Sequence, residues 1–265
     1  MTTRLLAIAA AIALVAGCSS AKPVSQLLHE QQIAQDAGYA QYTERNWNGA
    51  ARSFQRAADL ANALDHYATE AAARHHQARA LQHTGKPDDA IAAYQRALDI
   101  NRRLQLTTPQ SDNLAGLSQC HAAQGRLPQA IEAAEQALPL ATTAKPIIQN
   151  DLAVLLLQRH ETGDLDRARQ LLDTALAGIS TNTASTVLGA TQLNLGRLAL
   201  QSGQPGNARP RLTQALATFR ACADATGIAT AHEALARCCA ALGDKPAAQF
   251  HAEQARIKSR FLKEH

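Results

Sequence analysis

The chain has 265 residues, of which 46% are apolar and only 3% aromatic, and its formal net charge is +4. This length is enough for one large domain or for an extended array of repeats. The small net charge and the few aromatic rings argue against a nucleic-acid partner, because such binders concentrate positive charge and stacking side chains. No segment alternates apolar and polar residues with the period of a β-strand, so the pattern predicts an all-α protein.

The N-terminal segment of the chain has the pattern of an export signal. Arg4 is followed by an uninterrupted apolar run from Leu5 to Gly17. A bilayer-spanning helix needs about 20 apolar residues, so this run is too short to cross a membrane. A short basic region followed by an apolar run of this length is typical of a secretory signal peptide. We therefore expect residues 1–17 to be a signal peptide.

The end of this segment is more specific. Val15-Ala16-Gly17-Cys18 resembles the lipobox of bacterial lipoproteins. The resemblance implies that Cys18 becomes the first mature residue and carries a diacylglyceryl thioether and an N-acyl chain such as palmitate, which together anchor a protein stably. It also implies that residues 18–24 are a lipidated tether. Because Ser19 follows the cysteine, we expect the outer membrane of a Gram-negative bacterium, facing the periplasm. The alternative is an ordinary signal peptide with a chance cysteine.

Residues 25–265 contain a recurring pattern, which is clearest in GKPDDAIAAYQRAL, residues 85–98. A glycine is followed by alanine after five residues and again after twelve. The pattern recurs, 38 or 40 residues apart, at Gly85, Gly125, Gly163, Gly203 and Gly243. A sixth copy lies upstream, where Ala50 and Ala57 are in register and Arg45 replaces the glycine.

Helix geometry explains the pattern. Ala90, Tyr94 and Ala97 are spaced by four and three residues, so they lie on one stripe of a helix. The small side chains let a neighbouring helix approach closely. The glycine ends the preceding helix, because glycine adopts a left-handed conformation at little cost. Prolines suited to the first turn of a helix follow two or three residues later, at Pro87, Pro128, Pro205 and Pro246. Each copy therefore predicts two helices joined by a tight turn.

This hairpin resembles the tetratricopeptide repeat (TPR), which has small residues at positions 8, 20 and 27 and a large one at position 24. Position 8 is small in five of six copies: Gly38, Ala78, Ser118, Leu156, Gly196 and Ala236. The resemblance covers residues 30 to 262. It implies a right-handed α-solenoid of six hairpins with a period of about 40 residues, at residues 31–64, 71–104, 111–144, 149–182, 189–222 and 229–262.

Four features depart from the family pattern. The closing proline at position 32 is missing in every copy, and Leu156 is oversized for position 8. Pro139 falls inside the second helix of the third hairpin, which it should bend or end. Pro210 would clash inside the second helix of the fifth hairpin, so we expect that helix to start late, with Asn207 as its N-cap.

The cysteines and histidines point to packing and solvation. Cys222 and Cys238 are the best pair for a disulfide, but their distances from the intervening turn differ by about 12 Å at 1.5 Å per residue. A disulfide joins Cα atoms within about 7 Å, so we expect none. Cys120 and Cys238 share a repeat position and should be buried packing residues. A redox or metal role is the alternative. Metal-site spacing is absent, so the histidines are expected to be solvated, among them His75, His76 and His83.

No catalytic motif, nucleophile elbow or phosphate-binding loop occurs, so we expect neither an enzyme nor a cofactor.

In TPR arrays, positions 2, 5, 9 and 12 of the first helix build the concave wall. The resemblance implies a peptide groove formed by Tyr39, Tyr42, His75, Arg79, Gln82, Gln119, Asn150, Arg197 and Arg237. Arginine presents a planar fork that suits carboxylates, so an acidic or C-terminal peptide segment is the expected ligand. The alternative is that these arginines are simply solvated.

Together these observations predict an outer-membrane lipoprotein that acts as a non-catalytic adaptor or scaffold. It would bind another envelope protein during cell-envelope assembly or secretion. Two alternatives remain open: a receptor for a small peptide or glycan, and an accessory subunit of an envelope enzyme.

Overall fold

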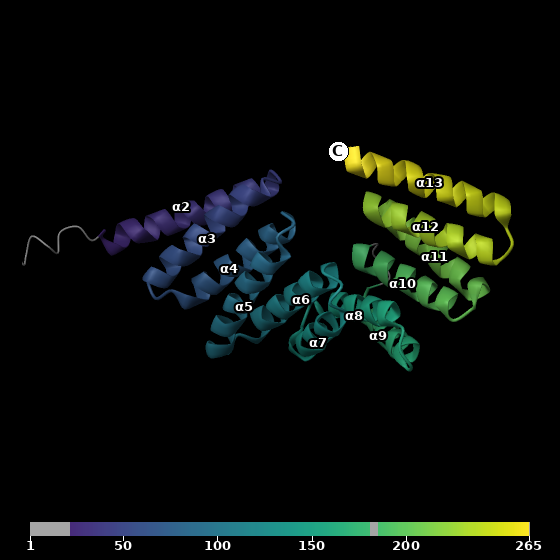
Figure 1. Cartoon of the computed structure of the whole chain (residues 1–265), viewed down its shortest axis with the longest axis horizontal. Helices are drawn as coiled ribbons and strands as arrows, with labels where there is room; N and C mark the ends of the chain where they lie inside the picture. The colour runs from purple at the N-terminus through teal and green to yellow at the C-terminus, as the bar shows by residue number, and fades with distance from the viewer. Residues whose placement is uncertain (1–21, 181–184, 265) are drawn as a thin grey trace, which may run out of the picture. The chain divides into compact units, whose positions relative to one another are not determined.

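The computed structural model describes residues 22–180 and 185–264 (Figure 1). The expected signal peptide, Cys18 and most of the expected tether lie outside these ranges. The residues in them form α-helices, one short 3-10 helix and no strand. The helices are α2 (Val24–Thr43), α3 (Trp47–Ala63), α4 (Tyr67–Gln82), α5 (Pro87–Arg103), α6 (Thr107–Ala123), α7 (Leu127–Ala137), η1 (Leu138–Leu140), α8 (Lys145–Arg159), α9 (Asp164–Gly178), α10 (Thr186–Gln201), α11 (Pro205–Ala221), α12 (Ala225–Ala241) and α13 (Lys245–Glu264).

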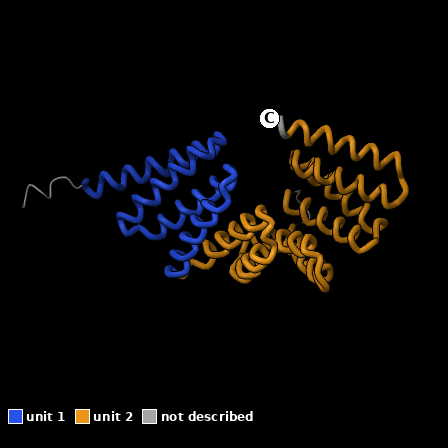
Figure 2. The backbone as a smooth tube through the Cα atoms, viewed as in Figure 1, with its two compact units in different colours: residues 1–104 blue, residues 105–265 orange. Residues whose placement is uncertain are grey.

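The helices fall into two compact units, which Figure 2 colours separately. The first unit ends at Leu104 and contains the hairpins α2–α3 and α4–α5. The second begins at Gln105 and contains the hairpins α6–α7, α8–α9, α10–α11 and α12–α13. Within each unit every α-helix packs against the next one in the chain, and α10 also contacts both α8 and α12. The prediction of an all-α fold of stacked helical hairpins is confirmed.

Small residues in one helix face large residues in the next. A Cβ atom added to Gly38 would lie 2.7 Å from the ring of Phe54, which is 1% exposed. Gly196 faces Leu212 even more closely, and Leu212 is fully buried. These are positions 8 and 24 of the repeat, so the recurring small and large residues bring the two helices of a hairpin together.

The fifth hairpin has a second close approach. The ring of Phe219, in α11, lies between Gly189 of α10 and Gly227 of α12. An added Cβ at Gly189 would come within 2.7 Å of this ring, and one at Gly227 would come closer still. In the fourth hairpin, by contrast, Leu156 and Leu172 belong to the same apolar core cluster, and both are fully buried. The oversized residue at position 8 is therefore accommodated in the core.

The turn glycines adopt the predicted left-handed conformation. Their φ angles lie between 69° and 88°, and Arg45, which replaces glycine in the first hairpin, has a φ of 59°. The sequence pattern did not identify a second set of left-handed residues. Asp65, Gln105 and Ala223, in the turns between hairpins, have φ angles of 54° to 57°.

The two unusual prolines behave differently. α7 ends at Ala137 and continues as a short 3-10 helix that contains Pro139, so the predicted end of this helix is confirmed. The expected late start of α11 is wrong. That helix begins at Pro205, with Gln204 as its N-cap, and runs through Pro210. The missing hydrogen bond would have been accepted by the carbonyl of Gly206. Gly206 and Pro210 are both exposed, so water can solvate that carbonyl.

Cys120 and Cys238 are buried, as predicted. The thiol of Cys238 donates a hydrogen bond to the carbonyl of Pro205 at 3.3 Å, and burial raises the pKa of this thiol. None of the four cysteines in the described ranges forms a disulfide.

Candidate functional site

In the second unit a pocket lies along the helices that open three successive hairpins, α8, α10 and α12. Its volume is about 220 Å³. Val154, Leu157 and Leu200 form its apolar wall, and Gln158, Gln201, Arg197 and Arg237 supply its polar groups. The side-chain amide of Gln201 donates to the carbonyl of Leu157 at 3.3 Å and so ties α10 to α8 beside the pocket.

The two arginines of this pocket were both predicted, and the structure brings them together. Arg197 is half-buried and Arg237 is exposed. Burial lowers the pKa of the Arg197 guanidinium, the carboxylate of Glu233 opposes this effect, and the charge of Arg237 adds to it. Among the described residues, neither guanidinium forms an ion pair or a hydrogen bond. A half-buried cation with open donors, next to a second cation, is a favourable place for a carboxylate.

Two other predicted residues of this unit lie apart from the pocket. Gln119 is exposed and its amide donates to the carboxylate of Asp151 at 3.2 Å. Burial raises the pKa of this carboxyl group, and the hydrogen bond partly offsets that effect.

Asn150 does not line a groove. It is 4% exposed, and its amide donates to the hydroxyl of Thr191 at 2.7 Å and accepts from Asn194 at 3.3 Å. These bonds join α8 to α10 inside the stack. The assignment of Asn150 to the groove therefore needs correction, because helix packing already uses its polar atoms.

In the first unit the predicted residues of α2 and α4 form an aromatic cluster. The ring of Tyr42 packs edge-on against Trp47, with their centroids 4.9 Å apart, and the guanidinium of Arg79 lies 5.4 Å from the centre of the Tyr42 ring. Trp47 stacks on His83 at 4.2 Å. This cluster exposes a cation held over an aromatic face, an arrangement that is favourable by about 0.5–1 kcal/mol at exposed sites.

The remaining predicted residues extend the same cluster. Tyr39 packs edge-on against both Phe54 and His76, and His75 packs against Tyr94. Gln82 accepts a hydrogen bond from the hydroxyl of Tyr94 at 3.0 Å.

The prediction of solvated histidines is wrong for His75 and His76 in this cluster. His75 and His76 are half-buried, and His83, although exposed, is stacked on an indole ring. Burial, reinforced by the neighbouring charges of His75 and Arg79, lowers the pKa of His76 to about 4. Trp47, His76 and His83 were missed because they lie outside the repeat positions that mark a concave wall. They join the cluster only through contacts between residues far apart in the sequence.

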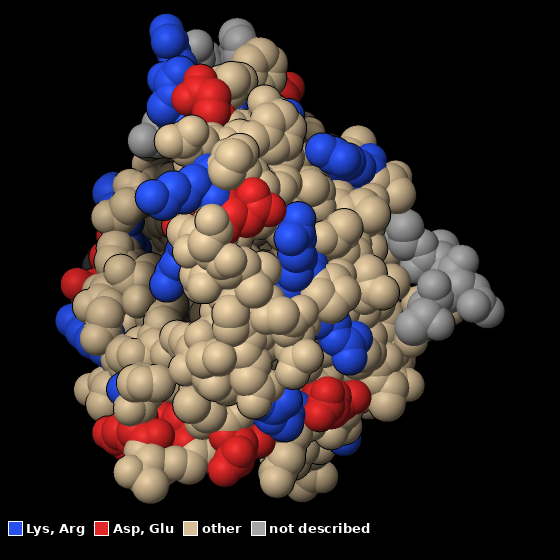
Figure 3. Space-filling view, turned by 90° about the vertical axis from the view of Figure 1, so that its right-hand side faces the viewer, with Lys and Arg blue, Asp and Glu red and all other residues tan. Residues whose placement is uncertain are grey.

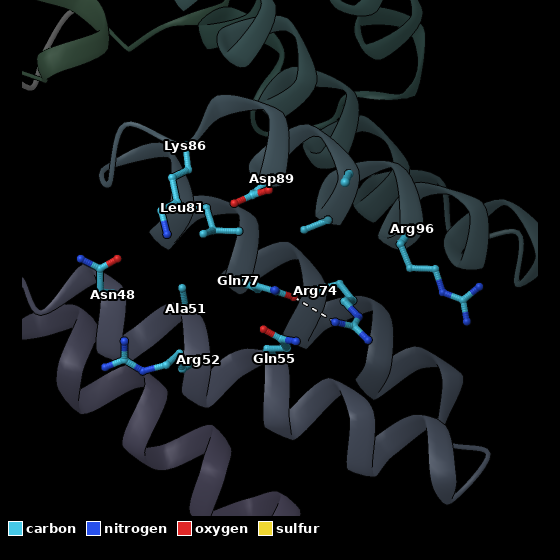
Figure 4. A pocket seen from close by; sticks show the side chains of 12 residues that line it. Asn48, Ala51, Arg52, Gln55, Arg74, Gln77, Leu81, Lys86, Asp89 and Arg96 are labelled. Carbon is cyan, nitrogen blue, oxygen red and sulfur yellow. Dashed lines mark hydrogen bonds between the residues drawn. The ribbon is translucent and has the colours of Figure 1, made fainter.

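The first unit contains a pocket that the sequence did not predict. It has a volume of about 530 Å³ and lies between α3, α4 and α5 (Figure 4). Its charged lining residues are Arg52, Arg74, Lys86, Asp89 and Arg96. Gln77 accepts a hydrogen bond from Arg74 in the pocket, whereas Arg96 points away from the other labelled side chains.

Part of this positive charge is already neutralised. Arg74 pairs with Asp59, and the Nε of Arg96 lies 3.1 Å from the buried carboxylate of Glu70. The pocket is therefore only mildly cationic. On the face of the molecule seen in Figure 3, positive and negative side chains are interspersed among uncharged residues.

Two features are absent from the ranges that the structure describes. Within them, no group of three or more histidine, cysteine or acidic residues is placed to hold a metal ion. No helix of residues 22–180 or 185–264 is both long and apolar enough to cross a membrane.

Comparison with known proteins gives a family and a fold. The family model for the tetratricopeptide repeat matches residues 69–143 and 187–256, more than half of the chain. No curated relative matches the sequence.

Several solved structures share the fold at low sequence identity. BtubC (BKLC) from P. vanneervenii is 18% identical with a TM-score of 0.65, over 90% of this chain and 93% of that one. The apo form of RapI is 10% identical with a TM-score of 0.74, over 90% and 66% of the two chains. The APC/C hetero-tetramer Cut9–Hcn1 contains a chain that is 20% identical, with a TM-score of 0.67, over 89% and 44%.

Proposed function

This chain belongs to the tetratricopeptide repeat family, and on that premise we propose that it is a non-catalytic adaptor for another protein. TPR proteins bind other proteins, and one similar structure is itself a hetero-tetramer. The proposed ligand is an extended segment of the partner that ends in, or contains, a carboxylate. The proposed contact is the pocket formed by Arg197 and Arg237.

The observation that carries this proposal is the pair of open guanidinium groups beside an apolar wall. A carboxylate at this place would accept from Arg197 and Arg237, and would satisfy the donors of Arg197, which is partly removed from water. The adjoining surface of Val154, Leu157 and Leu200 would receive an apolar side chain. A volume of about 220 Å³ suits one residue, so we favour the last residue of a chain over a longer buried segment.

The test is a binding assay with matched peptides. Labelled peptides that end in leucine with a free carboxylate are compared, by fluorescence anisotropy, with the same peptides carrying a C-terminal amide. We expect the amide to weaken binding about tenfold or more, equivalent to about 1.4 kcal/mol, because it removes the charge that the arginines recognise.

Variants connect this effect to the pocket. Arg197→Gln combined with Arg237→Gln should abolish the preference for the free carboxylate. Arg169→Gln, which removes an exposed arginine from α9, is the matched control and should leave it intact. Equal binding of acid and amide by the unmodified protein would contradict the proposed contact.

A ligand receptor would behave differently in the same assay. A receptor for small molecules should bind free leucine or a dipeptide as tightly as a longer peptide that ends in leucine. An adaptor should bind the longer peptide more tightly, because additional residues contact the surfaces beside the pocket.

We also propose that the chain is anchored to the outer membrane by lipids on Cys18 and that its partner is an envelope protein. The sequence around Cys18 supports this proposal. Metabolic labelling with a palmitate analogue should label the unmodified chain but not Cys18→Ala, and membrane fractionation should give the location. Equal labelling of both chains would rule out this anchor.

A further inference from the structure

The last helix, α13, carries an exposed apolar stripe. Phe250, Ile257 and Phe261 are 57%, 47% and 61% exposed. They are separated by seven and four residues, so they lie along one face of the helix. They are the seventh, fourteenth and eighteenth residues after the turn glycine Gly243.

The hairpin pattern does not require this stripe. The same three positions after the turn residue are also exposed in α3, α5 and α11, but they hold polar, charged or small residues and proline. They are Arg52, Asp59 and Ala63 in α3; Ala92, Asp99 and Arg103 in α5; and Pro210, Ala217 and Ala221 in α11. Large apolar side chains at these positions therefore distinguish α13.

The stripe is also not a stacking face left open at the end of the array. Internal hairpins bury an apolar residue thirteen positions after the turn residue, for example Ala58, Leu98 and Leu216. In α13 this position is Arg256, which is exposed. The side of α13 that would receive a further hairpin is therefore polar, and the apolar stripe lies elsewhere on the helix.

Basic residues border the stripe. Helical spacing places Lys258 on one side of it and Arg260 on the other. The helix as a whole is basic, with five lysine and arginine residues against two acidic ones, Glu253 and Glu264. Both oxygens of Glu253 accept from Arg256, at 2.7 and 2.8 Å. A second copy of α13 laid antiparallel on this face would bring basic rows together, which disfavours self-association. Aromatic and aliphatic residues with basic margins are typical of helices that lie in a membrane interface.

We propose that the outer face of α13 binds the surface of a bilayer that contains anionic phospholipid. The helix lies in the plane of the interface, with Phe250, Ile257 and Phe261 inserted at the headgroup level and Lys258 and Arg260 next to lipid phosphates. This contact is separate from lipidation at Cys18 and from the peptide pocket, and it requires neither.

The test measures the depth of α13 in a bilayer. Trp47, the only tryptophan, is replaced by phenylalanine, and Ile257→Trp supplies a single probe in the full chain. The vesicles contain phosphatidylcholine and phosphatidylglycerol with brominated acyl chains. On binding, we expect the tryptophan emission of the Ile257→Trp chain to shift to the blue and its intensity to fall by about half or more. Both changes should be smaller without phosphatidylglycerol or at high salt.

The matched control is Ala217→Trp, at the same repeat position in α11 and on the same background. Both chains carry the same N-terminus, so only the local depth of the probe differs between them. Equal quenching of the two probes, or no quenching at position 257, would overturn the proposal and leave a protein partner as the occupant of the stripe.

A second variant tests the basic margins without touching the apolar residues. Lys258→Gln with Arg260→Gln, in the Ile257→Trp chain, should remove the response to phosphatidylglycerol while helicity stays unchanged. An undiminished response in this chain would show that the margins do not recognise anionic lipid.

Discussion

The Nδ1 atoms of His232, in α12, and His251, in α13, lie 2.9 Å apart. At this distance one ring nitrogen must donate and the other accept, so both rings cannot be charged without placing two N–H groups face to face. His232 is 1% exposed, and burial lowers its pKa to about 4. Burial also lowers the pKa of His251.

This pair predicts that acid destabilises the second unit. The folded-state pKa of His232 lies below the value of about 6.5 for an unfolded histidine. The unfolded chain therefore binds more protons between these two values, and stability falls as the pH drops from about 6.5 towards 4. We expect a loss of about 1–2 kcal/mol between pH 7.5 and pH 5, measured by urea unfolding.

His232→Leu should reduce this pH dependence, whereas His29→Gln, which changes an exposed histidine of α2, should not. A pH profile that is identical in all three chains would contradict the role of His232. His76, whose pKa is also lowered to about 4, predicts the same sign for the first unit.

Two glycines three residues apart should respond to alanine in opposite ways. Gly203 has a φ of 69°, so Gly203→Ala should cost about 1–2 kcal/mol of backbone strain. Gly206 lies in the first turn of α11 and has open space around it, so Gly206→Ala should stabilise the helix by about 0.5–1 kcal/mol. Thermal unfolding of the two variants tests both expectations, and shifts in melting temperature of the same sign would contradict them.

Pro210→Ala should stabilise the protein. The change restores a donor for the carbonyl of Gly206 and removes the contact of the proline ring with that carbonyl. Because water already solvates this exposed carbonyl, we expect a gain of about 1 kcal/mol, below the roughly 3 kcal/mol that a proline costs in a helix interior. Pro205→Ala is the control, because a proline in the first position of α11 removes no helical hydrogen bond. A melting temperature for Pro210→Ala at or below that of the unmodified chain would show that the proline itself is needed for packing.

Gly38→Ala should destabilise the first hairpin by about 1–3 kcal/mol, because the new methyl group would overlap the ring of Phe54. That ring cannot easily move away, since Tyr39 and His76 pack against it. Phe54→Leu should make the glycine change less costly in a double-mutant cycle. Gly178→Ala, where the nearest neighbour is an atom of Pro146 at 3.9 Å, is the control and should have little effect.

The sequence predicts much of the fold because each hairpin repeats the same local chemistry. The turn glycines, the paired alanines and the prolines of the first turn mark helix ends and contact stripes directly. The start of α11 was predicted wrongly because the prediction considered only the hydrogen bond lost at Pro210. Water can replace that bond, since the carbonyl is exposed. Ala223 was missed because an alanine in a left-handed turn has no signature in the pattern.

The site was predicted only in part. Arg197 and Arg237 share a repeat position, so the periodicity places them on one wall. The periodicity does not reveal which polar side chains form hydrogen bonds between packed helices. Asn150 was assigned to the groove wrongly for that reason. Trp47 and His83 stack across two hairpins, so nothing local in the sequence connects them.

The ring of Phe219, held between Gly189 and Gly227, has a consequence for how this protein can evolve. A larger side chain at either glycine is tolerated only after position 219 has become smaller, and that first step leaves a void. The three codons should therefore change together among descendants of this gene, and lineages that keep phenylalanine should keep both glycines.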